Sequence, residues 1–286
     1  MRLWLNGLSP HTQRNYRRYF KQFRAFCPIP IDQITLSDIL AFKEHVEAMP
    51  IADGSKHFVL AAIKSFFQFV TVKLRLLPVD VAAPLRMSGV KETLGERIMS
   101  EEEVERLIIA AKPGRDRIIL EMLYYTGMRR AELVGLTWAD ATPRDDVEGM
   151  GGQLKLFGKG KKTRTVLIPI ATWAKLLALR PSSPAAAVGS ADPNAADGDG
   201  RSKIFAITSG QVYRIVKSAA RAAHCSPQAS PHWLRHCNAS HALDRGCKIH
   251  VVQQQLGHAS LATTSRYLHA RPKESSAAFL RPPRPM

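Results

Sequence analysis

Apolar residues recur at helical spacing along most of this chain, and the pattern is clearest in its first 77 residues. In SPHTQRNYRRYFKQFRAFC the aromatic side chains fall on one helical face, at Tyr16, Tyr19, Phe20, Phe23 and Phe26. The segments DILAFKEHVEAM, with Ser37 as its expected N-cap, and KHFVLAAIKSFFQFVTVKL continue the pattern. We therefore predict a small, wholly helical domain over residues 1–77. The opposite face of its first long helix is cationic and carries Arg14, Arg17, Arg18 and Lys21.

The periodic pattern stops at residues 78–98, where PVDVAAPLRMSGVKETLGERI contains two prolines and two glycines. This stretch is typical of an interdomain linker. Residues 99–286 then predict a second domain of mixed type. Ser100 and Glu103 form a capping box at the start of one helix, and a strongly apolar helix ends at Gly127. The fold class expected is mainly α with a small β-sheet.

Two further segments of the second domain depart from the helical pattern. GGQLKLFGKGKKTRTVLIPI alternates apolar and polar residues about a Gly-Lys-Gly turn, which predicts a β-hairpin. Residues 181–202 form a low-complexity stretch, which we expect to be a flexible insertion because it lacks the apolar residues needed to bury a core. Helical spacing resumes at SGQVYRIVKSAARAAH and continues toward the end.

The segment LGHASLATTSRYLH places His258 and Tyr267 nine residues apart. On one unbroken helix these side chains would lie on opposite faces, because each residue advances by about 100°. Gly257 predicts the end of the helix IHVVQQQL, and Ser260, Thr263 and Thr264 offer N-caps for a new helix. We therefore predict two helices that bring His258 and Tyr267 toward one point.

The charge of the chain narrows the class of partner. There are 41 Lys and Arg against 24 Asp and Glu, a formal net charge of +17, and the pI is about 10.1. Such a balance favours a polyanion, above all nucleic acid, over an anionic membrane surface or charge kept for solubility alone.

The cysteines and the apolar runs of the sequence indicate where in the cell the protein acts. The four cysteines show no CxxC spacing, so we expect reduced thiols rather than a zinc site or disulfides. The apolar part of MRLWLNGLSP is too short for a signal peptide, so we expect none, and no apolar run is long enough to span a membrane. These features predict a cytoplasmic, nucleoid-associated protein with double-stranded DNA as its partner.

Four stretches carry polar groups that invite a chemical role. In TGMRRAEL, Arg129 falls at the start of a helix, where it can receive an anion; alternatively, Arg129 or Arg130 pairs with Glu132 on the same helix. In GKGKKTR, Lys159 sits between two glycines, and it either reaches toward a phosphate or is a solvated turn residue. We assign the basic neighbours Lys161, Lys162 and Arg164 to DNA contact.

The other two stretches add proton carriers. In SPHWLRHCNASHAL, His232 and Arg235 share a helical face, although a histidine such as His232, taken alone, is more often a partly buried structural residue than a catalyst. His236 is consistent with either role. Tyr267 on an amphipathic helix is either a nucleophile or a core tyrosine with its hydroxyl bonded to the backbone.

Taken together, these residues fit phosphodiester chemistry without a metal or a cofactor. The sequence holds no carboxylate cluster of the kind that binds catalytic metal ions. Tyr267 would attack phosphorus and form a covalent intermediate, while Arg129 and Arg235 hold the non-bridging oxygens. Lys159 or a histidine would protonate the departing 5′ oxygen.

The segments TGMRRAEL, GKGKKTR, HWLRH and LGHASLATTSRY, in this order, resemble the signature boxes of the tyrosine recombinase (phage integrase) family. The resemblance covers about Met99 to His269, and the helical first domain is similar to the family's SAM-like core-binding domain. It implies a C-shaped clamp on duplex DNA, a homotetramer on two sites with a monomer possible without DNA, and a 3′-phosphotyrosine intermediate resolved through a Holliday junction. It also implies a catalytic pocket with Tyr267 as nucleophile and, around it, Arg129, Lys159, His232, Arg235 and His258.

Some features depart from the family or leave alternatives open. The insertion at 181–202 is long for a compact recombinase, and the chain opens directly with core-binding helices, as in the Xer-like architecture. In the tail, 271–286, residues 277–280 predict a short apolar helix that either docks on a neighbouring protomer or is frayed. A type IB topoisomerase and a non-catalytic DNA-binding protein stay open as alternatives, with a membrane-surface protein more distant.

Overall fold

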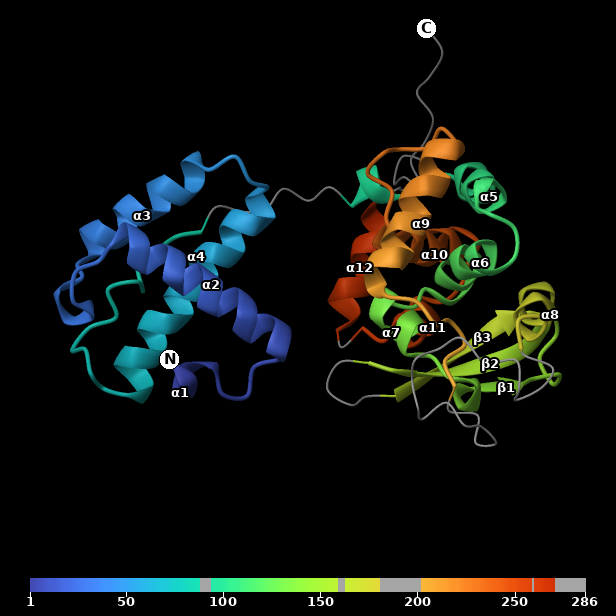
Figure 1. Cartoon of the computed structure of the whole chain (residues 1–286), viewed down its shortest axis with the longest axis horizontal. Coiled ribbons are helices and arrows are strands. Elements are labelled where there is room, and N and C mark those ends of the chain that lie inside the picture. Colours follow the sequence, from blue (N-terminus) through green and yellow to red (C-terminus); the bar gives the residue numbers. More distant parts are fainter. Residues whose placement is uncertain (88–93, 159–162, 181–201, 259, 271–286) are drawn as a thin grey trace, which may run out of the picture. The chain divides into compact units, whose positions relative to one another are not determined.

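The computed structural model describes residues 1–87, 94–158, 163–180, 202–258 and 260–270 of the 286-residue chain. By its internal contacts the chain divides into two compact units, Met1–Glu92 and Thr93–Met286 (Figure 1). Each unit has a hydrophobic core of its own.

All regular secondary structure in the described part of the first unit is helical. Its elements are α1 (Arg2–Leu5), α2 (Pro10–Phe26), η1 (Ile31–Gln33), α3 (Leu36–Ala48), α4 (Asp53–Gln68) and η2 (Phe69–Lys73). Helix α2 packs across α4, and their aromatic residues interlock, with the rings of Phe20 and Phe66 4.3 Å apart between centroids. Tyr19, Phe20 and Phe23 are buried on the predicted apolar face, whereas Phe26 is 39% exposed at the end of the helix. The helical prediction for this region is confirmed.

The N-cap predicted for α3 was wrong. Thr35, not Ser37, caps the helix: its hydroxyl accepts a hydrogen bond from the backbone N–H of Asp38, whose carboxylate accepts one from the N–H of Thr35. This reciprocal capping box satisfies two backbone donors at once, which a cap at Ser37 would not do.

The stretch predicted to be an interdomain linker, 78–98, contributes residues to both cores. Ala82 and Leu85 are buried in the first unit, and Leu94 and Ile98 are buried in the second. The first compact unit continues past residue 77, to Glu92. Single buried apolar residues without a period give no helical or strand pattern, so this packing cannot be seen in the sequence.

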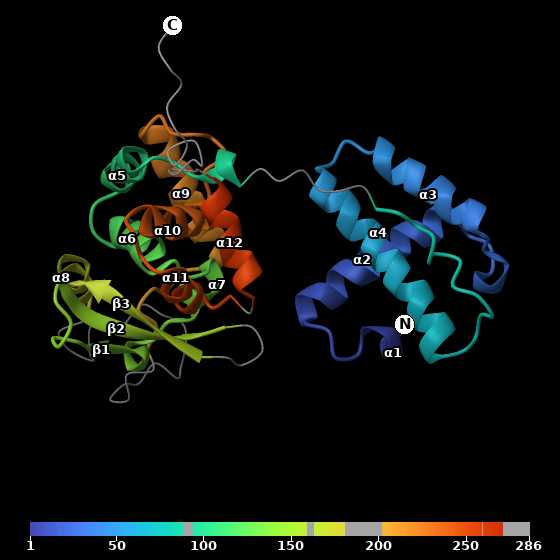
Figure 2. The same ribbon diagram turned by 180° about the vertical axis from the view of Figure 1, so that it is seen from behind.

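The second unit combines helices with one sheet. Its elements are η3 (Gly95–Arg97), α5 (Glu101–Ala110), α6 (Arg115–Thr126), α7 (Arg130–Gly135), η4 (Trp138–Asp140), β1 (Ala141–Pro143), β2 (Met150–Phe157), β3 (Thr163–Pro169), α8 (Ile170–Leu177), α9 (Ser209–Ala222), α10 (Pro231–Asp244), α11 (Ile249–Leu256) and α12 (Leu261–Ala270). The views from front and back both place α10 between α6 and α12 (Figures 1 and 2). Helix α10 is therefore the centre of the helical layer.

The sheet is antiparallel in the order β1-β2-β3. Leu154 pairs with Val166, and these two residues face the core together with Leu156 and Ile168. The predicted hairpin is confirmed, and β1 is an addition that its three residues were too short to predict. Gly152 leaves room for Trp173 of α8, because a Cβ at this glycine would lie 2.2 Å from the indole ring.

Most helical predictions for the second unit hold. The capping box of Ser100 and Glu103 is present, and α6 ends at Gly127. The helix predicted over RRAELVGLTW is shorter than expected, because Leu136 is extended and a 3₁₀ turn follows. The predicted break after Gly257 separates α11 from α12.

Candidate active site

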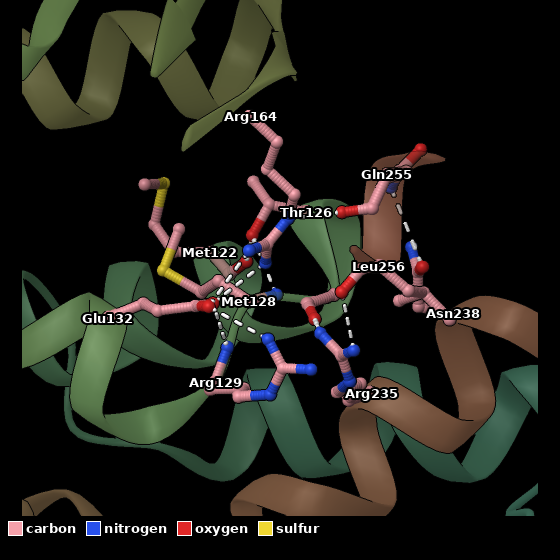
Figure 3. Close-up of polar contacts among 11 residues, drawn as sticks. Met122, Thr126, Met128, Arg129, Glu132, Arg164, Arg235, Asn238, Gln255 and Leu256 are labelled. Carbon is pink, nitrogen blue, oxygen red and sulfur yellow. Dashed lines mark hydrogen bonds and ion pairs between the residues drawn. The ribbon is translucent and has the colours of Figure 1, made fainter. Parts of the chain in front are cut away.

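The guanidinium of Arg235 lies at the centre of the helical layer and joins two helix ends. Its side chain projects from α10 and is 1% exposed. Nη1 donates to the carbonyl oxygen of Gly127, at the end of α6, over 2.5 Å, and Nη2 donates to that of Leu256, at the end of α11, over 2.6 Å (Figure 3). These carbonyls are among those that a helix leaves without an internal partner at its end. One arginine thus fastens three helices.

Glycine is needed at both of these helix ends. Gly127 and Gly257 have positive φ angles of 61° and 65°, a conformation that other residues adopt at a cost. A Cβ at Gly127 would lie 2.6 Å from a methyl group of Leu256, and one at Gly257 would lie 3.1 Å from Cδ of Arg164. The close approach of these segments therefore depends on the two glycines.

Arg129 lies where α7 begins, and its ion pair with Glu132 is present. Its backbone N–H donates to Oε2 of Glu132 over 2.7 Å, and its Nη1 donates to Oε1 over 3.0 Å. The side chain of Arg129 is nevertheless 41% exposed, while that of Glu132 is 4% exposed. Of the two interpretations offered by the sequence, the ion pair is realised, and it leaves an exposed guanidinium edge at the helix start.

Arg164 does not point outward as expected for a DNA contact. Its side chain, on β3, is 10% exposed and forms a bidentate pair with Glu132, with distances of 2.8 and 2.7 Å. Its Nε donates to the backbone carbonyl of Gln255 over 2.7 Å (Figure 3). Arg164 thus belongs to the interior of the site.

These arginines influence one another electrostatically. Burial, followed by repulsion from Arg129 and Arg164, lowers the pKa of Arg235. A guanidinium titrates so far above neutrality that Arg235 stays charged at pH 7. Burial raises the pKa of Glu132, but the hydrogen bonds from Arg164 and Arg129 outweigh it, so its pKa is lowered and the carboxylate is ionised.

Tyr267 of α12 lies inside the same helical layer. It is 6% exposed, and its hydroxyl lies 2.8 Å from Nδ1 of His236 on α10. Burial raises the pKa of the phenol, and Arg235 is close enough to oppose this shift. The nucleophile of the proposed chemistry is therefore held as a neutral, hydrogen-bonded phenol. His236, which the sequence left open, is its partner.

The prediction that His258 and Tyr267 converge is confirmed. Their rings are nearly parallel, at 4°, with centroids 6.3 Å apart. Nδ1 of His258 lies 2.9 Å from Oγ1 of Thr264, a fully buried residue of α12. This bond fixes the imidazole beside the tyrosine across the break between the two helices.

The histidines of the site are neutral at pH 7. Burial lowers the pKa of His258 to about 4 and that of His236 to about 3, and the neighbouring positive charges add to both shifts. The pKa of His232 is lowered too, by desolvation and then by Arg235. The residue His232 is exposed overall, and the centroid of its ring lies 4.2 Å from that of His236.

The other predicted residues fall into two groups. Lys159, Lys161 and Lys162 lie outside the described residues, as does the tail. Four basic residues of α2 are exposed on its outer face: Arg14, Arg17, Arg18 and Lys21.

Several functional groups were not found from the sequence. Sequence reasoning missed the carbonyls of Gly127 and Leu256 as anchors, and it treated Glu132 only as an alternative partner for Arg129. The three-residue spacing of Arg129 and Glu132 was the signal in the sequence that could have indicated the role of Glu132.

In the part of the chain that the structure describes, no helix has the length and apolarity to cross a membrane. In those residues no three His, Cys, Asp or Glu side chains come together in a metal-binding group.

The arrangement suits the transfer of a phosphoryl group. A phenol, neutral imidazoles and fixed guanidinium groups from five segments of the chain meet at one end of α10. Such a site can supply a nucleophile, proton acceptors and charge stabilisation for an anionic transition state.

Two family models match this chain, one in each unit. The model of the phage integrase family matches residues 97–274, and that of the phage integrase N-terminal SAM-like domain matches residues 3–73. Tyrosine recombinase XerC of Mycobacterium sp. (strain KMS) is 31% identical over 278 residues, covering 92% of this chain and 89% of the relative. XerC of Mycobacterium tuberculosis (strain ATCC 25177 / H37Ra) is 30% identical over 275 residues, with the same coverage.

Solved structures share the fold at lower identity. A lambda integrase dimer bound to a COC′ core site has a TM-score of 0.68 and 20% identity, covering 96% of this chain and 79% of that one. The XerH site-specific recombinase in a post-cleavage complex with palindromic difH substrate also has a TM-score of 0.68 and 20% identity, covering 90% of this chain and 76% of that one.

Proposed function

The chain belongs to the phage integrase family, and on this premise we propose that it cuts and rejoins duplex DNA as a site-specific tyrosine recombinase. The observation that carries the assignment of residues is the convergence on α10 of Tyr267, His258 and Arg235 with Arg129. These groups come from distant parts of the chain and have complementary roles in phosphodiester exchange.

In the cleavage step Tyr267 Oη forms a bond to the scissile phosphorus, and the bond from phosphorus to the 5′ oxygen breaks. The phenolic proton passes to a neutral imidazole of the site, and Lys159 or a histidine protonates the 5′ oxygen as it leaves. Arg129 and Arg235 stabilise the charge that builds on the non-bridging oxygens. Reversal of the same step by a different 5′ hydroxyl rejoins the strand.

The bond between Tyr267 and His236 bears on how this step begins. Tyr267 is 6% exposed, and its hydroxyl is engaged with Nδ1 of His236. We infer that α12 shifts when DNA binds, so that the hydroxyl leaves His236 and approaches Arg129 and Arg235. The proposal therefore includes a resting form in which the nucleophile is covered.

DNA binding is assigned to the basic surfaces. The cationic face of α2 is exposed, and we propose that it contacts the phosphate backbone together with Lys161 and Lys162 of the hairpin. We further propose a homotetramer on two sites, with a tail that docks on a neighbouring protomer, and action on DNA in the cytoplasm. One solved structure with this fold is a lambda integrase tetramer bound to a Holliday junction.

A covalent-adduct assay tests the proposal directly. A duplex that the protein selects from a randomised pool is nicked next to the scissile position, so that the released fragment diffuses away and the adduct accumulates. We expect a band of protein joined to DNA that Tyr267→Phe abolishes and that Tyr213→Phe, a change at an exposed tyrosine of α9, leaves intact. An adduct that persists in Tyr267→Phe would reject this nucleophile.

The alternatives give different results. A type IB topoisomerase would relax any supercoiled plasmid without a specific site, whereas a recombinase requires paired sites. A non-catalytic DNA-binding protein would bind the selected duplex and form no adduct.

A further inference from the structure

Arg164 has no role in the chemistry proposed above, although its guanidinium reaches into the polar network drawn in Figure 3. Its sequence context, GKGKKTR, predicted an outward-facing DNA contact. Instead, its three nitrogen groups are all engaged inside the protein: Nη1 and Nη2 with Glu132, and Nε with the carbonyl of Gln255. A guanidinium so enclosed is not available to a phosphate.

The carboxylate of Glu132 is shared between two arginines. Oε1 accepts hydrogen bonds from Nη1 of Arg129 and Nη1 of Arg164, while Oε2 accepts from the backbone N–H of Arg129 and Nη2 of Arg164. In the view of Figure 3 the guanidinium of Arg164 lies above this carboxylate and that of Arg129 below it. Four donors thus fix one side chain that is 4% exposed.

The net charge of Arg129, Glu132 and Arg164 determines how well this cluster can stabilise a developing anion. Glu132 with Arg129 would form a neutral pair, and a neutral pair stabilises a developing anion poorly. Arg164 adds a second positive charge, so the three side chains together carry a net charge of +1. Of the three side chains only that of Arg129 is exposed, so the net positive charge reaches the surface there. Its Nη2 and Nε have no hydrogen-bond partner among the described residues.

Arg164 also reaches the segment that holds Arg235. The carbonyl of Gln255 accepts its Nε, and the next carbonyl along the chain, that of Leu256, accepts Nη2 of Arg235. The following residue, Gly257, packs against the Arg164 side chain. A single residue of β3 therefore connects the supports of both arginines of the site.

We propose that Arg164 is a positioning residue for strand cleavage: it balances and orients Glu132, so that Arg129 keeps its charge and its free donors for the scissile phosphate. The proposal rests on the function proposed above, because it requires that Arg129 act on the phosphate. Lysine cannot replace Arg164 fully, since one ammonium group cannot bond both oxygens of Glu132 and the carbonyl of Gln255 in this geometry.

The test compares adduct formation by four variants at saturating duplex: Arg164→Met, Arg164→Lys, Glu132→Gln and the double variant Arg164→Met/Glu132→Gln. We expect Arg164→Met to slow cleavage on the order of 100-fold, comparable to the loss of one oxyanion donor. The double variant removes one positive and one negative charge and so restores the net charge of +1 for positions 129, 132 and 164; we therefore expect it to regain roughly tenfold over Arg164→Met. Arg164→Lys keeps the charge without the fork and should lie between wild type and Arg164→Met.

Two further measurements separate positioning from other roles. The affinity for duplex should keep its dependence on salt in all four variants, because a lost phosphate contact would reduce the slope by about one unit. Thermal unfolding shows which variants fold; the double variant leaves no unpaired buried charge and stays informative if Arg164→Met does not fold. Arg144→Met, at an arginine paired with Asp146 near the sheet, is the matched control and should cleave as wild type does.

The outcomes decide the question. A double variant no faster than Arg164→Met, or an Arg164→Met that cleaves at the wild-type rate, overturns the proposal. So does a reduced salt slope with unchanged cleavage of bound duplex, which would make Arg164 a DNA contact after all. Failure of the wild-type protein to form a Tyr267-dependent adduct would instead reject the proposed function, and this proposal with it.

Discussion

Arginines occupy two different environments in this protein. On α2 of the first unit, Arg14, Arg17 and Arg18 are exposed, and none has an ion pair among the described residues. In the second unit, Arg235 is 1% exposed and Arg164 is 10% exposed, and each is held by carbonyl or carboxylate oxygens. The same side chain is solvated in one unit and part of the interior in the other.

The difference indicates two ways of using positive charge. Exposed arginines attract a polyanion through a field that salt screens, and each adds a small and nearly independent increment. Buried arginines are fixed in place before DNA arrives, and the loss of one disturbs its partners. We therefore expect the α2 face to govern affinity and the interior network to govern the rate of cleavage.

The largest effect is expected at Arg235. In Arg235→Lys, one ammonium group replaces a fork that spans the carbonyls of Gly127 and Leu256. We expect adduct formation to slow on the order of 1000-fold and the melting temperature to fall, because a carbonyl is left buried without a partner. Arg221→Lys, on the exposed face of α9, is the control. A variant that cleaves at nearly the wild-type rate would remove Arg235 from the chemistry.

Gly127→Ala tests whether the interior network depends on the close approach of α6 to α11. The alanine would have to adopt the left-handed backbone conformation of Gly127, and its Cβ would lie 2.6 Å from a methyl group of Leu256. We expect the free energy of unfolding to fall by about 2 kcal/mol or more, measured by urea denaturation. In contrast, Gly54→Ala in α4 has open space around its Cβ and should be neutral or slightly stabilising. Equal stabilities for the two variants would contradict this account.

Stability should depend on pH through the buried histidines. Above pH 6.5 the imidazole of His236 is neutral in both the folded and the unfolded chain. Below pH 6.5 this imidazole binds a proton in the unfolded chain, whereas in the folded chain it does not until about pH 3. Acidification therefore destabilises the fold. His258 acts in the same direction down to about pH 4.

His236→Asn should remove one of these two contributions. We expect its free energy of unfolding to fall less steeply between pH 6 and pH 4, by about 1.4 kcal/mol per pH unit. His250→Asn, at an exposed histidine of α11, is the matched control for the substitution itself. An unchanged slope in His236→Asn would mean that this imidazole titrates normally in the folded protein.

The smallest effect is expected on α2. Arg17→Gln should weaken duplex binding a few-fold and reduce the salt slope by about one unit, while cleavage of bound duplex stays unchanged. Arg115→Gln serves for comparison because its charge is already paired with Asp116. A cleavage defect in Arg17→Gln at saturating duplex would break the division between affinity and rate.

Much of the fold was readable from local patterns. The capping box at Ser100 predicted the start of α5, and the glycines at 127 and 257 predicted the ends of α6 and α11. These signals are local because a cap or a left-handed residue acts on its own helix turn. The N-cap of α3 was misplaced by two residues, since Thr35 and Ser37 are both acceptable caps and only the partner carboxylate of Asp38 distinguishes them.

The candidate site was readable as a set of residues but not as a set of contacts. The break between His258 and Tyr267 was predicted from Gly257, and the structure brings the two rings together. The inward turn of Arg164 was not predicted, because nothing in GKGKKTR differs from a solvated basic turn. Likewise, the role of His236 as partner of Tyr267 depends on how α10 meets α12.

By itself the sequence determined the helices, the hairpin, the positive charge and the residues suited to phosphodiester exchange, because these follow from composition and from interactions between near neighbours. Only the tertiary structure decided which charges face solvent and which balance one another inside. The physical reason is that burial and pairing set the strength of each electrostatic interaction, and both depend on segments that lie far apart in the chain.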